Sequence, residues 1–150
     1  MRRKLKPLLH HDRSIHIAQK LIMKPKILIA DDDEGIRDIF RILLEKEGYA
    51  LEIKENGEDI LKNKFSVPDL FLIDKQLSGV NGLDVCRYLK ARKQTSHIPL
   101  IMISASPDIA CLSKQAGADG FIEKPFEIKS LLKVINDFIG KGRLAEAKPV

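Results

Sequence analysis

Short apolar runs alternate with helical patterns along most of this chain, and this alternation is the feature that most restricts its fold. Three of the runs have almost no polar interruption, as expected for strands that are covered on both faces. Such strands, separated by helices, are typical of β-α units that build a parallel sheet. We therefore expect an α/β fold, with strands at 26–31, 50–54, 69–74, 98–103 and 120–123.

Apolar residues between these strands recur every three or four positions, which predicts amphipathic helices packed on the sheet. The first helix carries Ile36, Phe40 and Leu44 on one face and should end at Gly48. Right-handed crossovers then give an open, doubly wound sheet, and 150 residues suffice for one domain. The remaining helices are predicted near 57–64, 82–93, 107–117 and 127–139.

The positive charge of the chain is concentrated at its beginning. The formal net charge is +5, but residues 1–26 carry eight Lys or Arg against the single acid Asp12. We interpret 1–23 as a basic N-terminal extension that is solvated; binding to nucleic acid or an anionic membrane is the less favoured alternative. Met23 resembles a natural start, so one hypothesis is that residues 1–22 have no function.

No targeting or membrane-spanning segment is evident, because polar residues interrupt the only signal-like start and no stretch approaches the roughly 20 apolar residues of a span. We expect a cytoplasmic protein without a membrane partner. Cys86 and Cys111 are predicted on different helices as reduced, buried thiols. The four histidines have no metal-ligand spacing.

Polar residues follow the expected strands at the sheet edge where open α/β folds bind ligands. The first strand ends in Asp31, Asp32 and Asp33, Asp74 ends the third, Ser104 follows the fourth, and Lys124-Pro125 follows the fifth. Two unit charges about 4 Å apart interact at roughly 4 kcal/mol at an effective dielectric of 20, so neighbouring acids need a cation. Lys124 supplies one positive charge, and the hard oxygen ligands predict a Mg²⁺ site.

From about residue 24 to 140 the chain resembles the receiver domain of bacterial two-component response regulators, of the chemotaxis-regulator type. The resemblance is carried by "ILIADDDEGIR", "PDLFLIDKQLSGVNGLDVCRYLK", "PLIMISA" and "AGADGFIEKPF", in that order. It implies a flavodoxin-like (βα)5 fold, a doubly wound five-stranded parallel sheet with strand order 2-1-3-4-5. Residues 24–140 would form the receiver and 141–150 a polar C-terminal tail.

The resemblance also implies a metal site. Asp74 matches the phosphate acceptor, a carboxylate nucleophile. Asp32 matches the acid that binds Mg²⁺ directly and Asp31 the acid that acts through water, while the backbone carbonyl of Gln76 completes the protein ligands. Asp33 is interpreted as a helix N-cap.

Residues that contact the phosphoryl group follow from the same resemblance. Lys124 and Ser104 match the residues that pair with phosphoryl oxygens, and the Lys124-Pro125 peptide is expected to be cis. Phe121 matches an aromatic switch that reshapes the face made by the fourth helix, fifth strand and fifth helix; a core aromatic is the alternative. Ser78 and Asn81 depart from the family pattern, which usually has proline and an acid there.

The resulting prediction is a stand-alone receiver, a signalling domain with self-catalysed phosphorylation and dephosphorylation rather than an enzyme. A sensor histidine kinase or phosphotransfer protein would supply the phosphoryl group. The output would be a downstream protein target, with a homodimer through the fourth helix, fifth strand and fifth helix as a further expectation. Nucleic acid is not expected, because no helix-turn-helix pattern follows the receiver.

Two alternatives remain open. Asp31-Asp32-Asp33 also satisfies the D-x-D pattern of haloacid-dehalogenase-like phosphohydrolases, with Asp31 as nucleophile and Asp33 as general acid. That family needs an acidic pair after Lys124, which this chain lacks, and it leaves Asp74 without a role. The second alternative is a degenerate receiver that acts only as a docking module, and the intact acid set argues against it.

Overall fold

One parallel five-stranded sheet forms the centre of the computed structural model, which describes residues 9–147. The strand order is β2-β1-β3-β6-β7. Because β6 and β7 are the fourth and fifth strands of this sheet, the order is the predicted 2-1-3-4-5, and the predicted fold is confirmed. The strands are β1 (Lys26–Ala30), β2 (Ala50–Lys54), β3 (Leu70–Asp74), β6 (Leu100–Ser104) and β7 (Gly120–Glu123).

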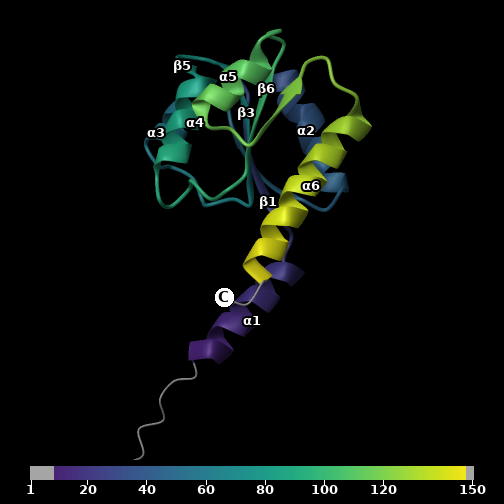
Figure 1. Cartoon of the computed structure of the whole chain (residues 1–150). Coiled ribbons are helices and arrows are strands. Elements are labelled where there is room, and N and C mark those ends of the chain that lie inside the picture. Colours follow the sequence, from purple (N-terminus) through teal and green to yellow (C-terminus); the bar gives the residue numbers. More distant parts are fainter. Residues whose placement is uncertain (1–8, 148–150) are drawn as a thin grey trace, which may run out of the picture.

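Helices cover both faces of the sheet (Figure 1). The helices α2 (Glu34–Lys46) and α6 (Ile128–Ala147) pack on one face, and α3 (Glu58–Leu61), α4 (Gly82–Ala91) and α5 (Ile109–Ala116) on the other. Successive strand residues point to opposite faces, so Ile27 and Ile29 contact the first layer while Leu28 and Ala30 contact the second. Every residue of β3 and β6 is buried, which explains their continuous apolar sequences.

Local signals set the helix ends as predicted. The Asp33 carboxylate accepts a hydrogen bond from the Ile36 backbone N–H at 3.0 Å and caps α2. Gly48, with φ of 91°, follows the end of α2 in a left-handed conformation that suits glycine. Gly117 closes α5 in the same way, with φ of 88°.

The structure also corrects several predicted elements. The helix predicted at 57–64 is regular only over Glu58–Leu61, because Asn63 takes a left-handed conformation with φ of 58°. The last helix does not end near 139 but continues to Ala147. A small antiparallel hairpin, β4 (Gln76–Leu77) with β5 (Val80–Asn81), was not predicted; it turns through Gly79, whose φ is 76°.

The basic extension contains a helix, α1 (Leu9–Ile22), that was not predicted. Figure 1 shows α1 beside the last turns of α6, at the end of the sheet opposite the carboxyl ends of the strands. Arg143 of α6 donates a hydrogen bond to the Met23 carbonyl at 2.8 Å, and Lys20 lies 3.7 Å from Asp69. Residues 1–8 and 148–150 lie outside the described residues, so the division into extension, receiver and tail stays a prediction.

Two further predictions concern the thiols and the membrane. Cys86 on α4 is buried and free as predicted, and burial raises the pKa of its thiol to about 11. Cys111 on α5 is free but exposed, because it lies outside the apolar stripe of Ile109, Leu112 and Ala116. Within residues 9–147, none of the helices has the length and apolar character to cross a bilayer.

Candidate functional site

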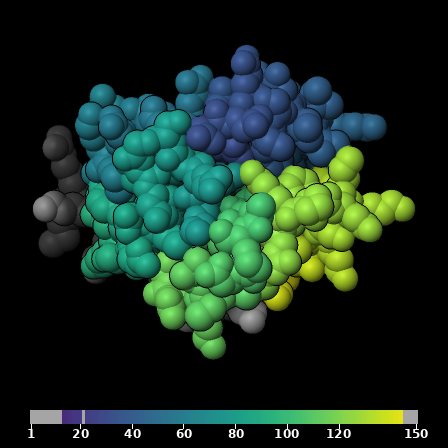
Figure 2. Space-filling view, turned by 90° about the horizontal axis from the view of Figure 1, so that it is seen from above, coloured from purple at the N-terminus to yellow at the C-terminus, as the bar shows by residue number. Residues whose placement is uncertain are grey.

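Four segments that leave the sheet at its carboxyl edge meet in one place. Figure 2 looks down on this edge and shows the segments after β1 (blue), β3 (teal), β6 (green) and β7 (yellow-green) around a common centre. Three side chains at the strand ends are buried although polar, with exposed fractions of 1% for Asp31, 5% for Asp74 and 3% for Ser104. Together with Lys124 we call these residues the acid pocket.

Lys124 is the cation of the acid pocket. Its Nζ donates a hydrogen bond to Asp74 Oδ2 and lies 3.5 Å from Asp31 Oδ2. Burial alone would lower the pKa of Lys124, but the hydrogen bond and charge of Asp74, helped by Asp31, raise it above its ordinary value. The backbone N–H of Lys124 donates to the Ser104 carbonyl at 2.9 Å, and the Lys124-Pro125 peptide is cis as expected.

Asp31 is the acid with an unsatisfied oxygen. Its Oδ1 accepts the Asp33 backbone N–H at 2.9 Å. Its Oδ2 is buried and receives no hydrogen bond from any described residue. Burial raises the pKa of Asp31 to about 6, although the Asp33 N–H opposes the shift and Asp74 adds to it. A buried carboxylate oxygen without a donor is suited to bind a cation.

Asp74 is held from its backbone as well as from its side chain. Its Oδ1 accepts the Gln76 N–H at 2.8 Å. The N-terminus of α4 packs directly on this segment, where Gly82 N–H donates to the Lys75 carbonyl at 2.8 Å. A Cβ atom at Gly82 would collide with the Asp74 carbonyl oxygen, so only glycine fits. The sequence analysis missed Gly82, because its contact with Asp74 appears only in the fold.

The other predicted metal ligands lie at the rim of the acid pocket. Asp32 is exposed, and its Oδ2 accepts a hydrogen bond from Ser78 Oγ at 3.3 Å. Gln76 is exposed and pairs with Asn81 in the β4–β5 hairpin. Among the side chains that the structure describes, no three acidic, His or Cys residues already form a metal-holding group. The donors are nonetheless all oxygens, and the unsatisfied Asp31 Oδ2 fits a hard cation such as Mg²⁺.

The hydroxyl of Ser104 is a hydrogen-bond donor at the acid pocket. Its Oγ accepts the Ser106 backbone N–H at 3.0 Å, and no described residue accepts a hydrogen bond from its hydroxyl, which can therefore donate into the pocket. Lys75 Nζ donates to Ser106 Oγ at 3.0 Å, which links the segments after β3 and β6. This link was not predicted.

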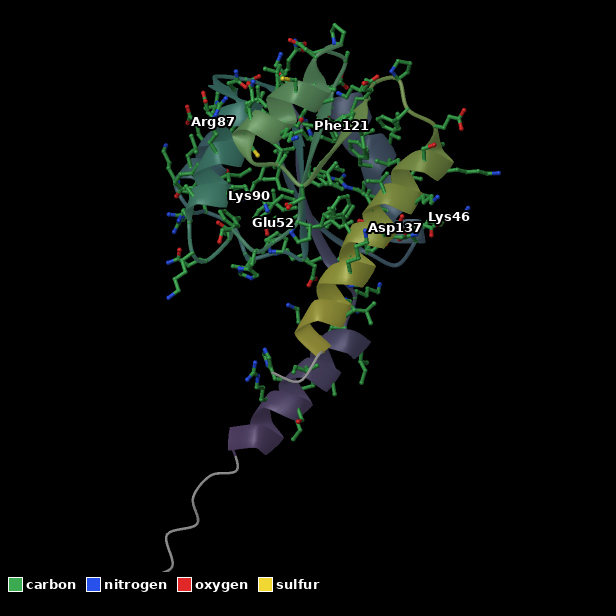
Figure 3. The ribbon with its side chains drawn as sticks, viewed as in Figure 1. Lys46, Glu52, Arg87, Lys90, Phe121 and Asp137 are labelled. Atoms are coloured by element: carbon green, nitrogen blue, oxygen red, sulfur yellow. The ribbon has the colours of Figure 1, made fainter. Side chains whose placement is uncertain are left out.

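Two predicted residues lie outside the acid pocket. Asp33, the general acid of the phosphohydrolase alternative, uses its carboxylate to cap α2. Phe121 on β7 is 41% exposed, so the core-aromatic alternative is wrong (Figure 3). Its side chain lies at the surface, where it lines a hollow together with Ser130 and Val134 of α6.

Known proteins resemble this chain over the same region. The family model of the response regulator receiver domain matches residues 27–136. The DNA-binding response regulator MtrA of Mycolicibacterium paratuberculosis is 37% identical over 113 residues, which are 73% of this chain and 49% of that protein. The chain thus spans about half the length of the curated relatives it matches.

Two solved structures share the fold along nearly their whole length. A CheY-like response regulator receiver domain protein from Methanospirillum hungatei JF-1 is 31% identical, with a TM-score of 0.72 over 82% of this chain and 98% of that one. The chemotaxis response regulator CheY4 of Vibrio cholerae is 25% identical, with a TM-score of 0.71 over 77% of this chain and 99% of that one.

The matched segment contains the carboxyl ends of all five strands and every residue of the acid pocket. The sequence match, the sheet order and the solved relatives all indicate the same family. On these grounds the chain belongs to the family of response regulator receiver domains, the signalling domains of two-component phosphorelay systems.

Proposed function

We propose that this receiver accepts a phosphoryl group on Asp74 in a Mg²⁺-dependent reaction. The donor is a phosphohistidine of a sensor histidine kinase or phosphorelay protein. The phosphorylated receiver then signals to a protein partner through the surface formed by α5, β7 and α6. The observation that carries the proposal is the Lys124 ammonium shared between Asp74 and Asp31 at the carboxyl edge of the sheet.

The charges of the acid pocket suit a phosphoryl acceptor. Asp31 and Asp74 bring two carboxylates to a site that holds one ammonium, so the site attracts further positive charge. Mg²⁺ bound by Asp31, Asp32, Asp74 and the Gln76 carbonyl would supply that charge and neutralise phosphoryl oxygens. Lys124 and Ser104 remain as the donors that this chain itself offers to the phosphoryl group.

The transfer itself is a nucleophilic substitution at phosphorus. A carboxylate oxygen of Asp74 forms a bond to phosphorus while the bond from phosphorus to the donor's imidazole nitrogen breaks, and the nitrogen keeps the electron pair. Lys124 exchanges its contact with Asp74 Oδ2 for a phosphoryl oxygen. Ser104 donates its free hydroxyl hydrogen to another. Both contacts are charge-assisted and strengthen as Asp74 gains negative charge.

The output depends on a shift between two conformations. Moving an equilibrium from 1:99 to 99:1 requires about 5.5 kcal/mol of differential stabilisation, which new charge-assisted hydrogen bonds at Lys124 and Ser104 can supply. Phe121 is placed to respond, because β7 pairs directly with β6, which ends at Ser104. Loss of the exposure of Phe121 on phosphorylation would mark the switch.

The partners follow from the family and stay proposals for this chain. The MtrA relatives are DNA-binding response regulators about twice as long as the region they share with this chain, so their DNA binding is not assigned to it. A homodimer through α5, β7 and α6, and function as a stand-alone receiver, remain predictions. Light scattering of the phosphorylated protein tests the first.

A phosphorylation assay tests the proposal directly. Purified protein is incubated with a small acyl phosphate and Mg²⁺, and its intact mass is recorded. We expect one added phosphoryl group, absent in Asp74→Asn and after chelation of Mg²⁺. The matched control is Asp33→Asn, which keeps the N-cap and should keep the label. An unlabelled wild type, or a label that survives Asp74→Asn, would reject the proposal.

A further inference from the structure

The side chain of Arg37 is largely buried. It lies in the first turn of α2, and its side chain is only 13% exposed. Nη1 donates a hydrogen bond to the Asp31 backbone carbonyl at 3.0 Å, and Nη2 lies 3.5 Å from Glu55 Oε1. A guanidinium removed from water in this way needs such acceptors. One side chain therefore joins α2, the end of β1 and the segment after β2.

The carbonyl that Arg37 holds belongs to the peptide between Asp31 and Asp32. Because a peptide is planar, fixing its carbonyl also fixes the direction in which the Asp32 backbone begins. The turn is tied elsewhere by Asp31 N–H to the Lys54 carbonyl at 3.2 Å and by Asp33 N–H to Asp31 Oδ1 at 2.9 Å. Among the described residues, only Ser78 contacts the Asp32 carboxylate, and this contact is exposed, so the direction of the carboxylate depends mainly on its backbone.

We infer that Arg37 is a positioning residue, which holds the Asp31-Asp32 turn in the conformation that binds a divalent cation. Arg37 touches neither the cation nor the phosphoryl group; it acts through the peptide carbonyl. Glu55 in turn holds the outer half of the guanidinium from an exposed position. The inference rests on the Mg²⁺ site of the proposed function.

An electrostatic role and a positioning role of Arg37 predict opposite changes in Mg²⁺ affinity when the residue is replaced. A guanidinium behind two acids repels Mg²⁺, so by charge alone Arg37→Met should tighten Mg²⁺ binding. If Arg37 positions the turn, Arg37→Met should weaken binding, by about 10- to 100-fold for a supporting residue of a metal site. Arg37→Lys keeps the charge but loses the planar fork that reaches two acceptors, so positioning predicts weakening there too.

The test is isothermal titration calorimetry of the full-length protein with Mg²⁺ at low ionic strength. The matched control is Arg41→Met: Arg41 lies on the same helix, its side chain is 53% exposed, and its charge partner is Asp38 at 3.9 Å. Circular dichroism confirms that each variant is folded at the titration temperature. We expect weaker binding in Arg37→Met and Arg37→Lys, and wild-type affinity in Arg41→Met.

A second measurement separates positioning from mere stability. In the metal-free protein, the backbone amide resonances of Asp32 and Asp33 should move in Arg37→Lys and stay in place in Arg41→Met. Should Arg37→Met fail to fold, Arg37→Lys decides, because it keeps the charge, and it must weaken Mg²⁺ binding. Unchanged or tighter binding in the folded Arg37 variants overturns this inference alone. Absence of Mg²⁺ binding by the wild type overturns it together with the proposed metal site.

Discussion

Replacing Asp31 with asparagine should stabilise the metal-free protein at alkaline pH. The asparagine side chain would keep the acceptor for the Asp33 N–H but carry no charge into a site that is 1% exposed. Burial raises the pKa of Asp31 from 3.8 to about 6. The folded chain binds this proton more tightly than the unfolded chain does, so protonation of Asp31 stabilises the fold below about pH 4. This stabilisation is lost as the pH rises through about 6.

The size of the effect follows from the same shift. One pKa unit corresponds to 1.36 kcal/mol, so a shift of about two units corresponds to about 3 kcal/mol. The attraction of Lys124, 3.5 Å away, favours the charged form of Asp31 and is already included in this shift. We therefore expect Asp31→Asn to gain about 3 kcal/mol of unfolding free energy over the wild type at pH 8, and much less at pH 4.

Urea unfolding followed by circular dichroism measures this difference. Wild type and Asp31→Asn are compared at pH 4, 6 and 8 in the presence of a chelator. The difference in unfolding free energy between the two proteins cancels the contributions of other groups that titrate in both. Mg²⁺ should then stabilise the wild type at pH 8 and not Asp31→Asn, because a ligand that binds only the folded state raises its stability. A difference that is independent of pH, or a variant less stable than the wild type at pH 8, would refute the reasoning.

The remaining predictions concern single sites. Lys124→Met leaves Asp31 and Asp74 without their shared ammonium, so it should lose about 3 kcal/mol of unfolding free energy at pH 8, measured with urea. At acidic pH the variant should recover this lost stability. Gly82→Ala should lose about 2 kcal/mol and the phosphoryl label, because its Cβ collides with the Asp74 carbonyl; Gly140→Ala, with open space around it in α6, is the control and should keep both. A thiol reagent should add one group to the native protein, at Cys111, and a second only after unfolding, as read by mass; two groups on the folded protein would contradict the burial of Cys86. A chain that starts at Met23 should keep the phosphoryl label, because α1 lies at the opposite end of the sheet from the acid pocket; loss of the label would show that residues 1–22 are needed.

Much of the fold was predictable because β3 and β6 are buried on both faces. Burial on both sides demands continuous apolar sequence, and such runs can be recognised without a structure. The acid pocket was predictable for a related reason, since parallel strands bring their carboxyl ends to one edge. What sequence spacing could not supply was the geometry, such as the position of Lys124 between two acids.

The missed features all depend on contacts between distant residues. The helix α1 has a weak apolar stripe, with Ile15 and Ile22 exposed, and it packs near Arg143 of α6, far away along the chain. The β4–β5 hairpin has strands of two residues, too short for a periodic pattern. Arg37 occupies a polar position of an amphipathic helix, and its reach back to the Asp31 carbonyl appears only once α2 has folded beside β1.

The placement of α1 against the end of α6 has a practical consequence for measuring the partners of this protein. Both described ends of the chain leave from the same side, and the helix of 20 residues that leads there is roughly 30 Å long. A biosensor surface or bulky fusion joined at either described end, Leu9 or Ala147, would therefore sit away from Asp74. An immobilised chain would present Asp74, the proposed phosphoryl acceptor, outward, where the proposed kinase in solution can reach it.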